Sequence, residues 1–495
     1  MAKWVEIRKG ADFQSIGEKF GISSLTARLI RNKDITEESE IRQYLYGGLS
    51  DLCSASVMKG IIPAVEILQK KIKEGASIRI IGDYDIDGVC STYILLRGLT
   101  RAGAEVDTDI PDRKKDGYGL NEDLVKRAYD AGVDTIVTCD NGIAAVKEIA
   151  YAKSLGMTVI ITDHHELQEE IPPADVVVNP HQKDCPYPYK NLCGAGVAWK
   201  LVSALWEQLG VPEQELYEDL LLFAGFATVG DVMDLTGENR ILVKEALKLL
   251  KTTTHPGISA LIEVNEISRE TISAFHIGFV LGPCINASGR LDTAKRALEL
   301  LKTTDYEKAL VRAAELKALN DERKSMTDDG VQQALDQIEN SDMKRDRVLV
   351  IYLPDCHESL AGIIAGRIRE RYYRPVFVLT RSQDGVKGSG RSIETYSMFE
   401  EMSKCKELYT KYGGHPMAAG VSMPEKHVEK FRERLNELCT LTEKDLTEVV
   451  RIDIAMPFSY VSERLVEELS LLEPFGKGNS KPVFAVKGVQ VLETR

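Results

Sequence analysis

Long apolar runs are missing from the 495-residue chain. The run from Val348 to Leu353 is among the longest, and it is far shorter than the roughly 20 residues that a membrane-spanning helix needs. The residues after Met1 do not form the apolar stretch of a secretory signal peptide. We therefore expect a cytoplasmic protein with no membrane partner.

Paired cysteines are missing too, because none of the nine cysteines stands in a Cys-x-x-Cys motif. This argues against a zinc ribbon and a thioredoxin-like site, and the thiols of a large cytoplasmic chain are usually reduced. Cys185 and Cys193 stand near His181, and we interpret them as small loop residues rather than as metal ligands.

An excess of positive charge is also absent. The formal net charge is −13, which argues against a protein that coats DNA through bulk charge but is compatible with a local basic channel. The sequence has no P-loop, no Gly-x-Gly-x-x-Gly turn after its first apolar strand and no Gly-x-Ser-x-Gly elbow. ATP-driven motors and dehydrogenases are therefore excluded.

The sequence does contain several short apolar strands that end in acidic residues. Residues 78–82, 135–139 and 158–162 are such strands, and 175–178 adds a further one. Strands of this kind that alternate with helices predict an α/β fold with a parallel sheet covered on both faces. Such sheets bind ligands at the carboxyl ends of their strands, which is where these acids stand.

The pattern along the chain predicts several domains. A second, smaller α/β unit begins at Arg347, and a β-rich pattern begins near Val449 and alternates like a strand from Pro482 to Glu493. Because the pattern stops at Arg495, we expect a longer protein to continue beyond it. The predicted division is a helical segment at 1–48, a parallel-sheet domain at 49–303, long connecting helices at 304–340, a smaller α/β domain at 341–445 and the start of a β-rich domain at 446–495.

The strongest chemical signal is Asp83-Tyr84-Asp85-Ile86-Asp87-Gly88, directly after the first strand. Three carboxylates on alternate positions of one turn repel one another unless cations neutralise them, and hard divalent ions take oxygen ligands. An acidic surface turn would have the same composition. The two further strands that end in acids favour a metal site instead.

Two more motifs extend this site. Asp140-Asn141-Gly142 follows the second strand, and Asp163-His164-His165 follows the third. An imidazole among carboxylates favours Mn²⁺ or a similar ion over a Mg²⁺ cage of oxygens alone. Asp231 adds an acid beside a glycine, where a helix cap is the alternative interpretation. Together these groups predict two metal ions and phosphoester hydrolysis.

The order of these motifs resembles the DHH phosphoesterase superfamily, and 413–420 is similar to the signature of its DHH-associated domain. Residues 110–113, 117–120 and 286–290 are similar to the RecJ family, and 473–479 resembles the entry to its OB-like domain. The resemblance implies a single-stranded DNA-specific 5′-to-3′ exonuclease that releases 5′-mononucleotides in DNA recombination and repair. It implies Mn²⁺ as cofactor, with two ions and with Mg²⁺ as the alternative metal. Single-stranded DNA, a single-strand-binding protein and a RecQ-type helicase are the implied partners of a monomer.

The resemblance also implies residue roles around the metals. Asp87, Asp140, His164 and Asp231 match the ligands of one ion, and Asp85, with Asp87 and Asp140 as bridges, matches the set around the second. His165 matches a histidine that lies against the scissile phosphate. The implied catalytic groups are thus His165, Asp85 and Asp140, whereas Asp83 and Asp163 are expected to support the ligands from behind.

DNA contacts follow from the same resemblance. Arg113, Ser389 and Arg391 match a pocket for the 5′-terminal phosphate, and Arg290 and His415 match groups at the DNA backbone. An arginine fork suits phosphate, and the glycines that flank Ser389 let backbone N–H groups approach an anion.

Two positions depart from the family pattern. Ile81 stands where many members have a histidine, so we expect the second ion to bind more weakly. Cys284 stands where we expect an arginine, so one phosphate contact is expected to be missing although Arg290 remains.

Two other functions remain open from the sequence. An enzyme that hydrolyses oligoribonucleotides, small phosphoesters or pyrophosphate would share the metal ligands, but it would not need the connecting helices or the OB-like segment. A catalytically silent scaffold for DNA or replication proteins would be expected to have lost metal ligands. In this sequence every metal-ligand position except Ile81 is occupied. The basic run 367–374, with its tyrosines, fits either a single-strand stacking platform or an amphipathic helix.

Overall fold

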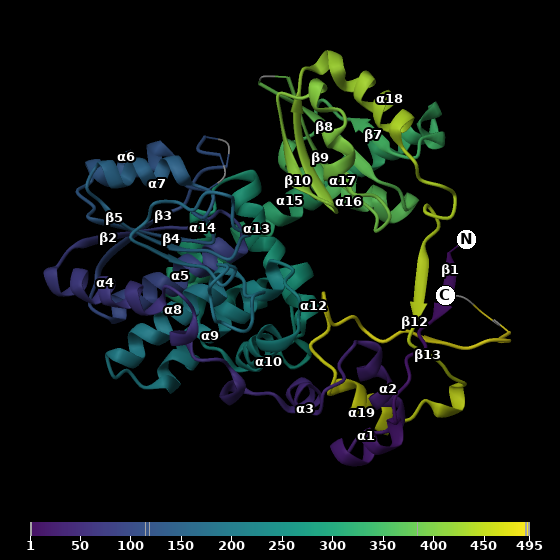
Figure 1. Ribbon diagram of the computed structural model, residues 1–495, viewed down its shortest axis with the longest axis horizontal. Helices are drawn as coiled ribbons and strands as arrows, with labels where there is room; N and C mark the ends of the chain where they lie inside the picture. Colours follow the sequence, from purple (N-terminus) through teal and green to yellow (C-terminus); the bar gives the residue numbers. More distant parts are fainter. Residues whose placement is uncertain (1, 114, 118, 384, 491–492, 494–495) are drawn as a thin grey trace. The chain divides into compact units, whose positions relative to one another are not determined.

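The computed structural model describes residues 2–113, 115–117, 119–383, 385–490 and 493. The chain forms two compact units that do not follow its order (Figure 1). The larger unit consists of 8–320 and 453–495, and the smaller unit consists of 1–7 and 321–452. No helix among the described residues combines the length and the apolar character that crossing a membrane requires.

A five-stranded parallel sheet lies at the centre of the larger unit, with the strand order β3-β2-β4-β5-β6. Its strands are β2 (Ser77–Ile81), β3 (Glu105–Asp109), β4 (Thr135–Cys139), β5 (Thr158–Thr162) and β6 (Val176–Val178). Ile81 pairs with Thr138, and Cys139 pairs with Thr162, so β2, β4 and β5 end close together. The acidic motifs that follow these strands therefore meet at one edge, as the sequence predicts.

Helices cover both faces of this sheet, which confirms the predicted α/β class. Ile80, Val137 and Ile160 are buried in a core shared with α4 (Ile61–Glu74), α5 (Ile86–Arg101) and α8 (Gly194–Gln208). Their neighbours Ile81 and Ile136 point the other way, into a second core shared with α6 (Glu122–Asp130) and α7 (Val146–Ser154). Figure 1 shows these two sets of helices on opposite sides of the strands. The alternation follows from the period of two that a strand imposes on its side chains.

The larger unit contains most of the helices of the described chain. They are α1 (Phe13–Phe20), α2 (Ser24–Asn32), α3 (Glu38–Tyr46), α4 (Ile61–Glu74), α5 (Ile86–Arg101), α6 (Glu122–Asp130), α7 (Val146–Ser154), α8 (Gly194–Gln208), α9 (Glu213–Gly230), α10 (Gly237–Thr252), α11 (Pro256–Val264), α12 (Ala274–His276), α13 (Gly282–Leu291), α14 (Lys295–Lys302) and α19 (Glu463–Ser470). A π-helical turn, Ile277–Leu281, joins α12 to α13. Where the sequence predicts connecting helices over 304–340, the structure has one helix, α15 (Tyr306–Glu339), and the boundary between the units falls within it.

The first and last segments of the larger unit share one hydrophobic core. Phe20 and Leu45 pack there with Ile454 and Leu472, so the helical N-terminal segment and the C-terminal segment are not separate in space. β13 (Ile454–Ala455) pairs with β14 (Phe484–Ala485).

The predicted strand at 482–493 is wrong in its length. Among the described residues of this span, 484–485 form the paired strand β14, and the carbonyl oxygen of Val483 also accepts a hydrogen bond from the N–H of Asp453. Val486 and Val489 are exposed, and residues 491 and 492 lie outside the described part of the chain.

The smaller unit has a mixed sheet with the order β10-β11-β9-β8-β7. Its strands are β7 (Leu349–Tyr352), β8 (Val376–Ser382), β9 (Gly385–Arg391), β10 (Lys411–His415) and β11 (Ala418–Met423), and its helices besides α15 are α16 (Ala361–Tyr372), α17 (Met398–Ser403) and α18 (Val428–Leu438). In α16, Ile364 and Ile368 are buried against the sheet, which favours the amphipathic-helix interpretation of 367–374. The chain's first strand, β1 (Lys3–Glu6), pairs in parallel with β12 (Val449–Ile452), so the N-terminal segment is not helical throughout.

Glu468 of α19 joins the C-terminal segment to the start of α2. One of its carboxylate oxygens accepts hydrogen bonds from the N–H of Ser23 at 2.9 Å, from the Ser23 hydroxyl and from the Thr26 hydroxyl at 2.6 Å. Burial alone would raise the pKa of Glu468, but these hydrogen bonds to the charged form outweigh it and lower the pKa to about 2.

We predict that this contact stabilises the fold only while Glu468 is ionised. The folded-state pKa lies below the ordinary value of 4.5, so the stabilisation is complete above that value and is lost as the pH falls towards 2. E468Q should lower the free energy of unfolding by about 3 kcal/mol near neutral pH and by much less near pH ~3, measured by urea unfolding. Glu467 is exposed and adjacent, so E467Q is the matched control. Equal pH dependence of E468Q and the unmodified protein would contradict the assignment.

Candidate metal centre and DNA contacts

The first acidic motif forms the tight turn between β2 and α5. Asp85 is the N-cap of α5, and its Oδ1 accepts hydrogen bonds from the N–H groups of Asp87 at 2.9 Å and Gly88 at 3.1 Å. A side chain at position 88 would collide with the backbone of Asp83. Glycine therefore lets the turn close, and the closed turn brings three carboxylates together at the start of one helix.

Asp87 is fully buried and lies against the N-terminus of α8. Its two carboxylate oxygens accept hydrogen bonds from the N–H groups of Gly194 at 2.6 Å and Ala195 at 2.7 Å. The N-terminus of a helix stabilises negative charge, which lowers the cost of burying this carboxylate. A Cβ atom at Gly194 would lie 2.7 Å from the Cβ of Asp140, so glycine is required there. This contact was not predicted from the sequence, where its signal is Gly194-Ala195-Gly196 at the start of an apolar helix.

The second motif bends sharply after β4. Asp140 has a φ of 60°, and Gly142 has a φ of 110°, where an L side chain is strained. The side-chain amide of Asn141 donates to the carbonyl oxygens of Ile81 at 3.1 Å and Cys139 at 2.9 Å. This amide ties the ends of β2 and β4 together and so sets Asp140 beside the first motif.

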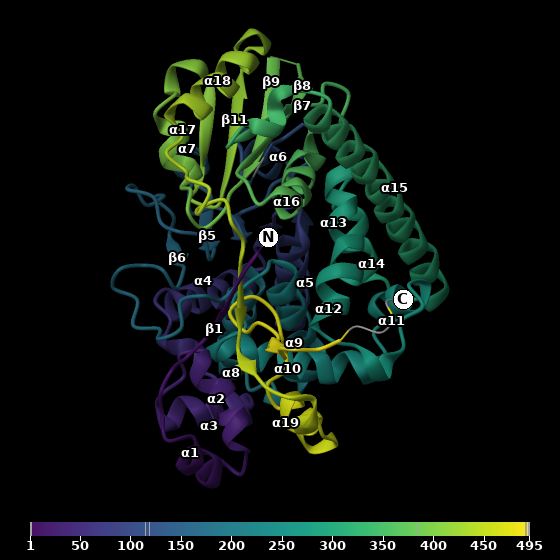
Figure 2. The ribbon, with the colours of Figure 1, turned by 90° about the vertical axis from the view of Figure 1, so that its right-hand side faces the viewer.

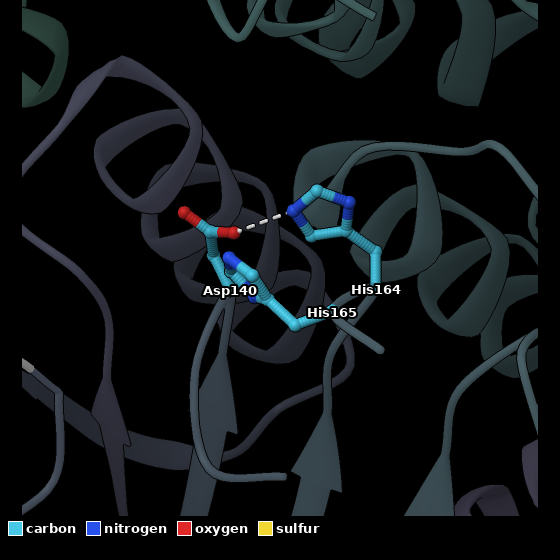
Figure 3. A group of neighbouring side chains, drawn as sticks. All are labelled: Asp140, His164 and His165. Atoms are coloured by element: carbon cyan, nitrogen blue, oxygen red, sulfur yellow. Dashed lines mark ion pairs between the residues drawn. The ribbon is translucent and has the colours of Figure 1, made fainter. Parts of the chain in front are cut away.

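His164 and His165 follow β5, and Figure 3 shows both beside Asp140, with the ion pair between Asp140 and His164 as a dashed line. Nε2 of His164 lies 3.1 Å from Oδ1 of Asp140, 3.6 Å from Oδ2 of Asp87 and 3.8 Å from Oδ2 of Asp231. Burial lowers the pKa of His164 despite these acids, so its imidazole is neutral and can bind a metal.

Asp163 forms hydrogen bonds with both histidines. Its Oδ1 accepts from the N–H of His164 at 2.7 Å and lies 2.8 Å from Nδ1 of His165, and its Oδ2 accepts from the N–H of Ile143. Burial opposes ionisation of Asp163, but the bonds from His165 and the backbone outweigh it and lower its pKa. The ionised Asp163 in turn outweighs the partial burial of His165 and raises the pKa of His165 to about 9. His165 is therefore protonated near neutral pH.

Asn179 is a positioning residue that the sequence analysis missed. Its side-chain amide donates to the carbonyl oxygen of His165 at 2.9 Å. It follows β6 directly, and a polar residue at that position is a weak signal by itself.

The predicted ligands, together with Asp83 and His165, form three overlapping groups, and within each group the potential ligand atoms lie within 4.8 Å of one another. The groups are Asp87, His164 and Asp231; Asp83, Asp85 and Asp140; and Asp140, His164 and His165. Asp231, the C-cap of α9, thus reaches the site as predicted. Asp83, which the resemblance implies as a supporting residue, shares a group with two expected ligands, Asp85 and Asp140.

The charges of this cluster are not balanced by the protein alone. Burial and then neighbouring carboxylates raise the pKa values of Asp83 and Asp231 to about 8 and that of Asp140 well above its usual range. Oδ1 of Asp83 is buried and accepts no hydrogen bond from any described residue. Crowded carboxylates and one neutral imidazole are the donor set that fits a divalent transition metal.

The motif at 286–290 packs directly on the first acidic turn. Asn286 accepts a hydrogen bond from the N–H of Ile86 at 2.8 Å, and Gly289 lies against the carbonyl of Tyr84. The guanidinium of Arg113 lies 5.0 Å from the centre of the Tyr84 ring, and Arg290 acts electrostatically on the same tyrosine. Two of the predicted phosphate contacts thus lie beside the metal cluster. Tyr118, within the motif at 117–120, and Lys114, next to Arg113, lie outside the described residues.

The two positions that depart from the family pattern are both buried. Ile81 packs in the core under α6 and α7 and contributes its carbonyl oxygen to Asn141. Sγ of Cys284 lies 3.8 Å from the side chain of Asn265 and 3.6 Å from that of Asn320. Cys185 and Cys193 are free and buried, and Sγ of Cys193 caps α8, as their interpretation as loop residues requires.

The remaining DNA candidates lie in the smaller unit, on one sheet. Arg391 of β9 pairs with Ala418, which pairs with His415 of β10, so His415 and Arg391 share one cross-strand row. Ser389 precedes Arg391 by two positions and faces the same side. Burial and the nearby charge of Arg369 lower the pKa of Arg391, which forms no ion pair with any described residue. This half-buried guanidinium is suited to an anion from outside.

Comparison with known proteins gives consistent matches along the chain. Residues 77–225 match the DHH family, N-terminal domain; 345–441 match the DHHA1 domain; and 452–495 match the RecJ OB domain.

Single relatives match this chain over all three of these regions. The chain is 36% identical to the single-stranded-DNA-specific exonuclease RecJ of Bacillus subtilis over 97% of its own length and 61% of the relative. It is 35% identical to RecJ of Salmonella typhimurium, and the match covers 93% of this chain and 82% of the relative. The crystal structure of Thermus thermophilus RecJ in complex with Mn²⁺ has a TM-score of 0.83 and 29% identity over 98% of this chain and 69% of that one. The chain thus spans less than two thirds of the Bacillus relative.

We predict that Mn²⁺ relieves the repulsion among these acids. Asp140→Asn removes one carboxylate, so it should raise the stability of the metal-free protein by about 1 kcal/mol or more and abolish most of the extra stability that Mn²⁺ confers. Thermal unfolding with EDTA and with Mn²⁺ measures both effects. E66Q, on the exposed face of α4, is the control and should behave like the unmodified protein. A Mn²⁺ response retained in D140N would exclude Asp140 as a ligand.

Proposed function

The chain belongs to the RecJ family of DHH proteins, and from this premise we propose that it is a metal-dependent exonuclease specific for single-stranded DNA. It would degrade the strand from the 5′ end and release 5′-mononucleotides, in DNA recombination and repair. The observation that carries the proposal is the set of carboxylates and His164 at the carboxyl edge of the parallel sheet, which form overlapping groups of three whose ligand atoms lie within 4.8 Å of one another.

The residue roles in this proposal are those that the family resemblance implies. Asp87, Asp140, His164 and Asp231 would hold one Mn²⁺, and Asp85 would hold a second together with Asp87 and Asp140; Mg²⁺ is the alternative metal. When bound, the pair of ions supplies activation of a water and neutralises charge on the leaving oxygen. Ile81 offers no nitrogen ligand, so the second ion is expected to be the weaker.

His165 would act on the scissile phosphate as a proton-bearing group. Asp163 holds Nδ1 of His165 and keeps the ring protonated, which leaves a cationic imidazole directed by a fixed carboxylate. A protonated imidazole stabilises the negative charge that develops on phosphate oxygens during hydrolysis. Asp163 is a positioning residue in this arrangement.

The DNA strand would be bound by phosphate contacts rather than by base recognition. Arg113, Ser389 and Arg391 would contact the 5′-terminal phosphate, and Arg290 and His415 would contact the DNA backbone near the metals. None of these side chains provides sequence-specific readout, in agreement with an enzyme that degrades any sequence. A cytoplasmic monomer that cooperates with a single-strand-binding protein and a RecQ-type helicase remains part of the proposal.

Product analysis on one oligonucleotide labelled at either end tests the reaction. With Mn²⁺ we expect progressive release of mononucleotides from the 5′ end, and with EDTA no cleavage. D140N should abolish cleavage while retaining DNA binding, because the phosphate contacts come from other residues. Turnover of a dinucleotide without cleavage of the long strand would instead support an enzyme for short substrates. Binding without turnover at millimolar Mn²⁺ would support a scaffold.

Arg391 provides a second test, which concerns the recognition of the 5′ end of the strand. R391Q should raise KM for a 5′-phosphorylated strand about ten-fold and reduce the preference over a 5′-hydroxyl strand, because a charge-assisted contact is lost. R381Q, on the exposed part of β8 in the same unit, is the matched control. An unchanged preference for the 5′-phosphate in R391Q would place the pocket elsewhere.

A further inference from the structure

Two phenylalanines in the helical part of the larger unit are stacked on each other in solvent. Phe275 is 60% exposed and Phe279 is 69% exposed, and their ring centroids lie 5.0 Å apart with an interplanar angle of 24°. Their neighbours Ile277 and Leu281 are buried, so the segment is firmly packed and the two rings are its outer face. The π-helical turn Ile277–Leu281 lies within this segment, and such turns are frequent at functional sites.

A basic groove adjoins the ring of Phe275. Its volume is about 460 Å³, and Phe275 and Phe475 contribute aromatic surface to it. The charged residues along it are Lys244, Lys248, Lys251, Lys481 and a single acid, Glu473. Lys248 pairs with Glu245 at 2.7 Å, whereas Lys251 and Lys481 form no ion pair with any residue that the structure describes. Such a concentration of lysines is notable in a chain whose net charge is −13.

The aromatic pair is connected to the metal centre by one continuous helical run. α12, the π-helical turn and α13 follow one another from Ala274 to Leu291, and Figures 1 and 2 show α12 and α13 in succession. The far end of the run bears Asn286 and Arg290, which meet the first acidic turn. At 1.5 Å per residue, Phe275 lies about 22 Å along the helix axis from Arg290.

We propose that Phe275 and Phe279, with the lysines of the adjoining groove, bind the single strand on the 3′ side of the bond that is cut. Bases would stack on the two exposed rings, and Lys251 and Lys481 would contact phosphates. This inference rests on the proposed nuclease function, because it assigns the surface to the same strand whose 5′ end reaches the metals.

Single-stranded nucleic acid is the occupant that suits this chemistry best. Aromatic platforms bind bases of any sequence through their faces, and lysines follow the backbone; the combination is typical of sequence-independent single-strand binding. A duplex keeps the faces of its bases stacked on one another, so the rings would also favour single strands over duplexes. Phe275, Phe279 and Lys251 lie between the DHH and DHHA1 matches, whereas Lys481 lies within the RecJ OB match.

The central experiment compares a long and a short 5′-phosphorylated strand. A strand of about four stacked nucleotides, at about 3.4 Å each, ends before the rings, whereas one of about 20 nucleotides passes them. The double variant F275A/F279A should raise KM for the long strand about ten-fold or more and leave kcat and the short-strand KM unchanged. F275W/F279W retains the stacking faces and should restore the long-strand KM. F458A, at another exposed phenylalanine of the same unit, is the control.

A binding measurement separates the lysines from the rings. The affinity of the long strand is measured with EDTA by fluorescence anisotropy as a function of salt. K251Q/K481Q should reduce the slope of log K against log salt by about 1.4, whereas F275A/F279A should weaken binding with little change in slope.

The outcomes are distinguishable from a failure of the proposed function. If the unmodified protein cleaves no single strand, the nuclease assignment fails, and the binding data still decide whether this surface holds DNA. If it cleaves normally and F275A/F279A matches F458A on both strands, this surface is not on the DNA path. A change in oligomeric state of F275A/F279A, with unchanged DNA binding, would instead assign the rings to a protein contact and overturn the proposal.

Discussion

Mutual repulsion among buried carboxylates at one edge of the parallel sheet is the constraint on which the metal centre depends. Asp87 is fully buried, and two backbone N–H groups at the start of α8 hold both of its oxygens. Because α8 begins so close to these carboxylates, a side chain at Gly194 would collide with Asp140. The position of a whole helix is thus coupled to one carboxylate, and the remaining negative charge is left for cations to neutralise.

The two adjacent histidines illustrate how packing assigns different chemistry to identical side chains. His164 points at Asp87, Asp140 and Asp231, and burial keeps its imidazole neutral, as a metal ligand requires. His165 is more exposed and is bonded to Asp163, which raises its pKa to about 9. The hydrogen bond between Asp163 and one of the two rings therefore makes His165 a charged group, whereas His164 stays neutral and can be a metal ligand. Asp163 can do this because Ile143 and the backbone of both histidines keep it ionised.

Much of this site could be predicted because its residues follow the strands in the sequence. Apolar strands alternating with helices indicate a parallel sheet, and parallel strands present their carboxyl ends at a common edge. Asp85, Asp140 and His164 could therefore be placed together without a structure. The support from Gly194 and Asn179 could not be predicted, since neither position has a distinctive local pattern. The same holds for the core that Phe20 shares with Leu472, which joins residues from opposite ends of the chain.

By itself, the sequence determined the order of strands and helices, the acidic and histidine motifs and the family to which they belong. These depend on local periodicity and on residues close together in the chain. The tertiary structure alone decided the neutral state of His164 and the protonated state of His165, because each results from burial and from charges contributed by several elements. It also decided that β14 is short and that Phe275 and Phe279 remain exposed, with Phe275 at the edge of the basic groove. Exposure and electrostatic environment are properties of packed neighbours, and only the folded chain brings those neighbours together.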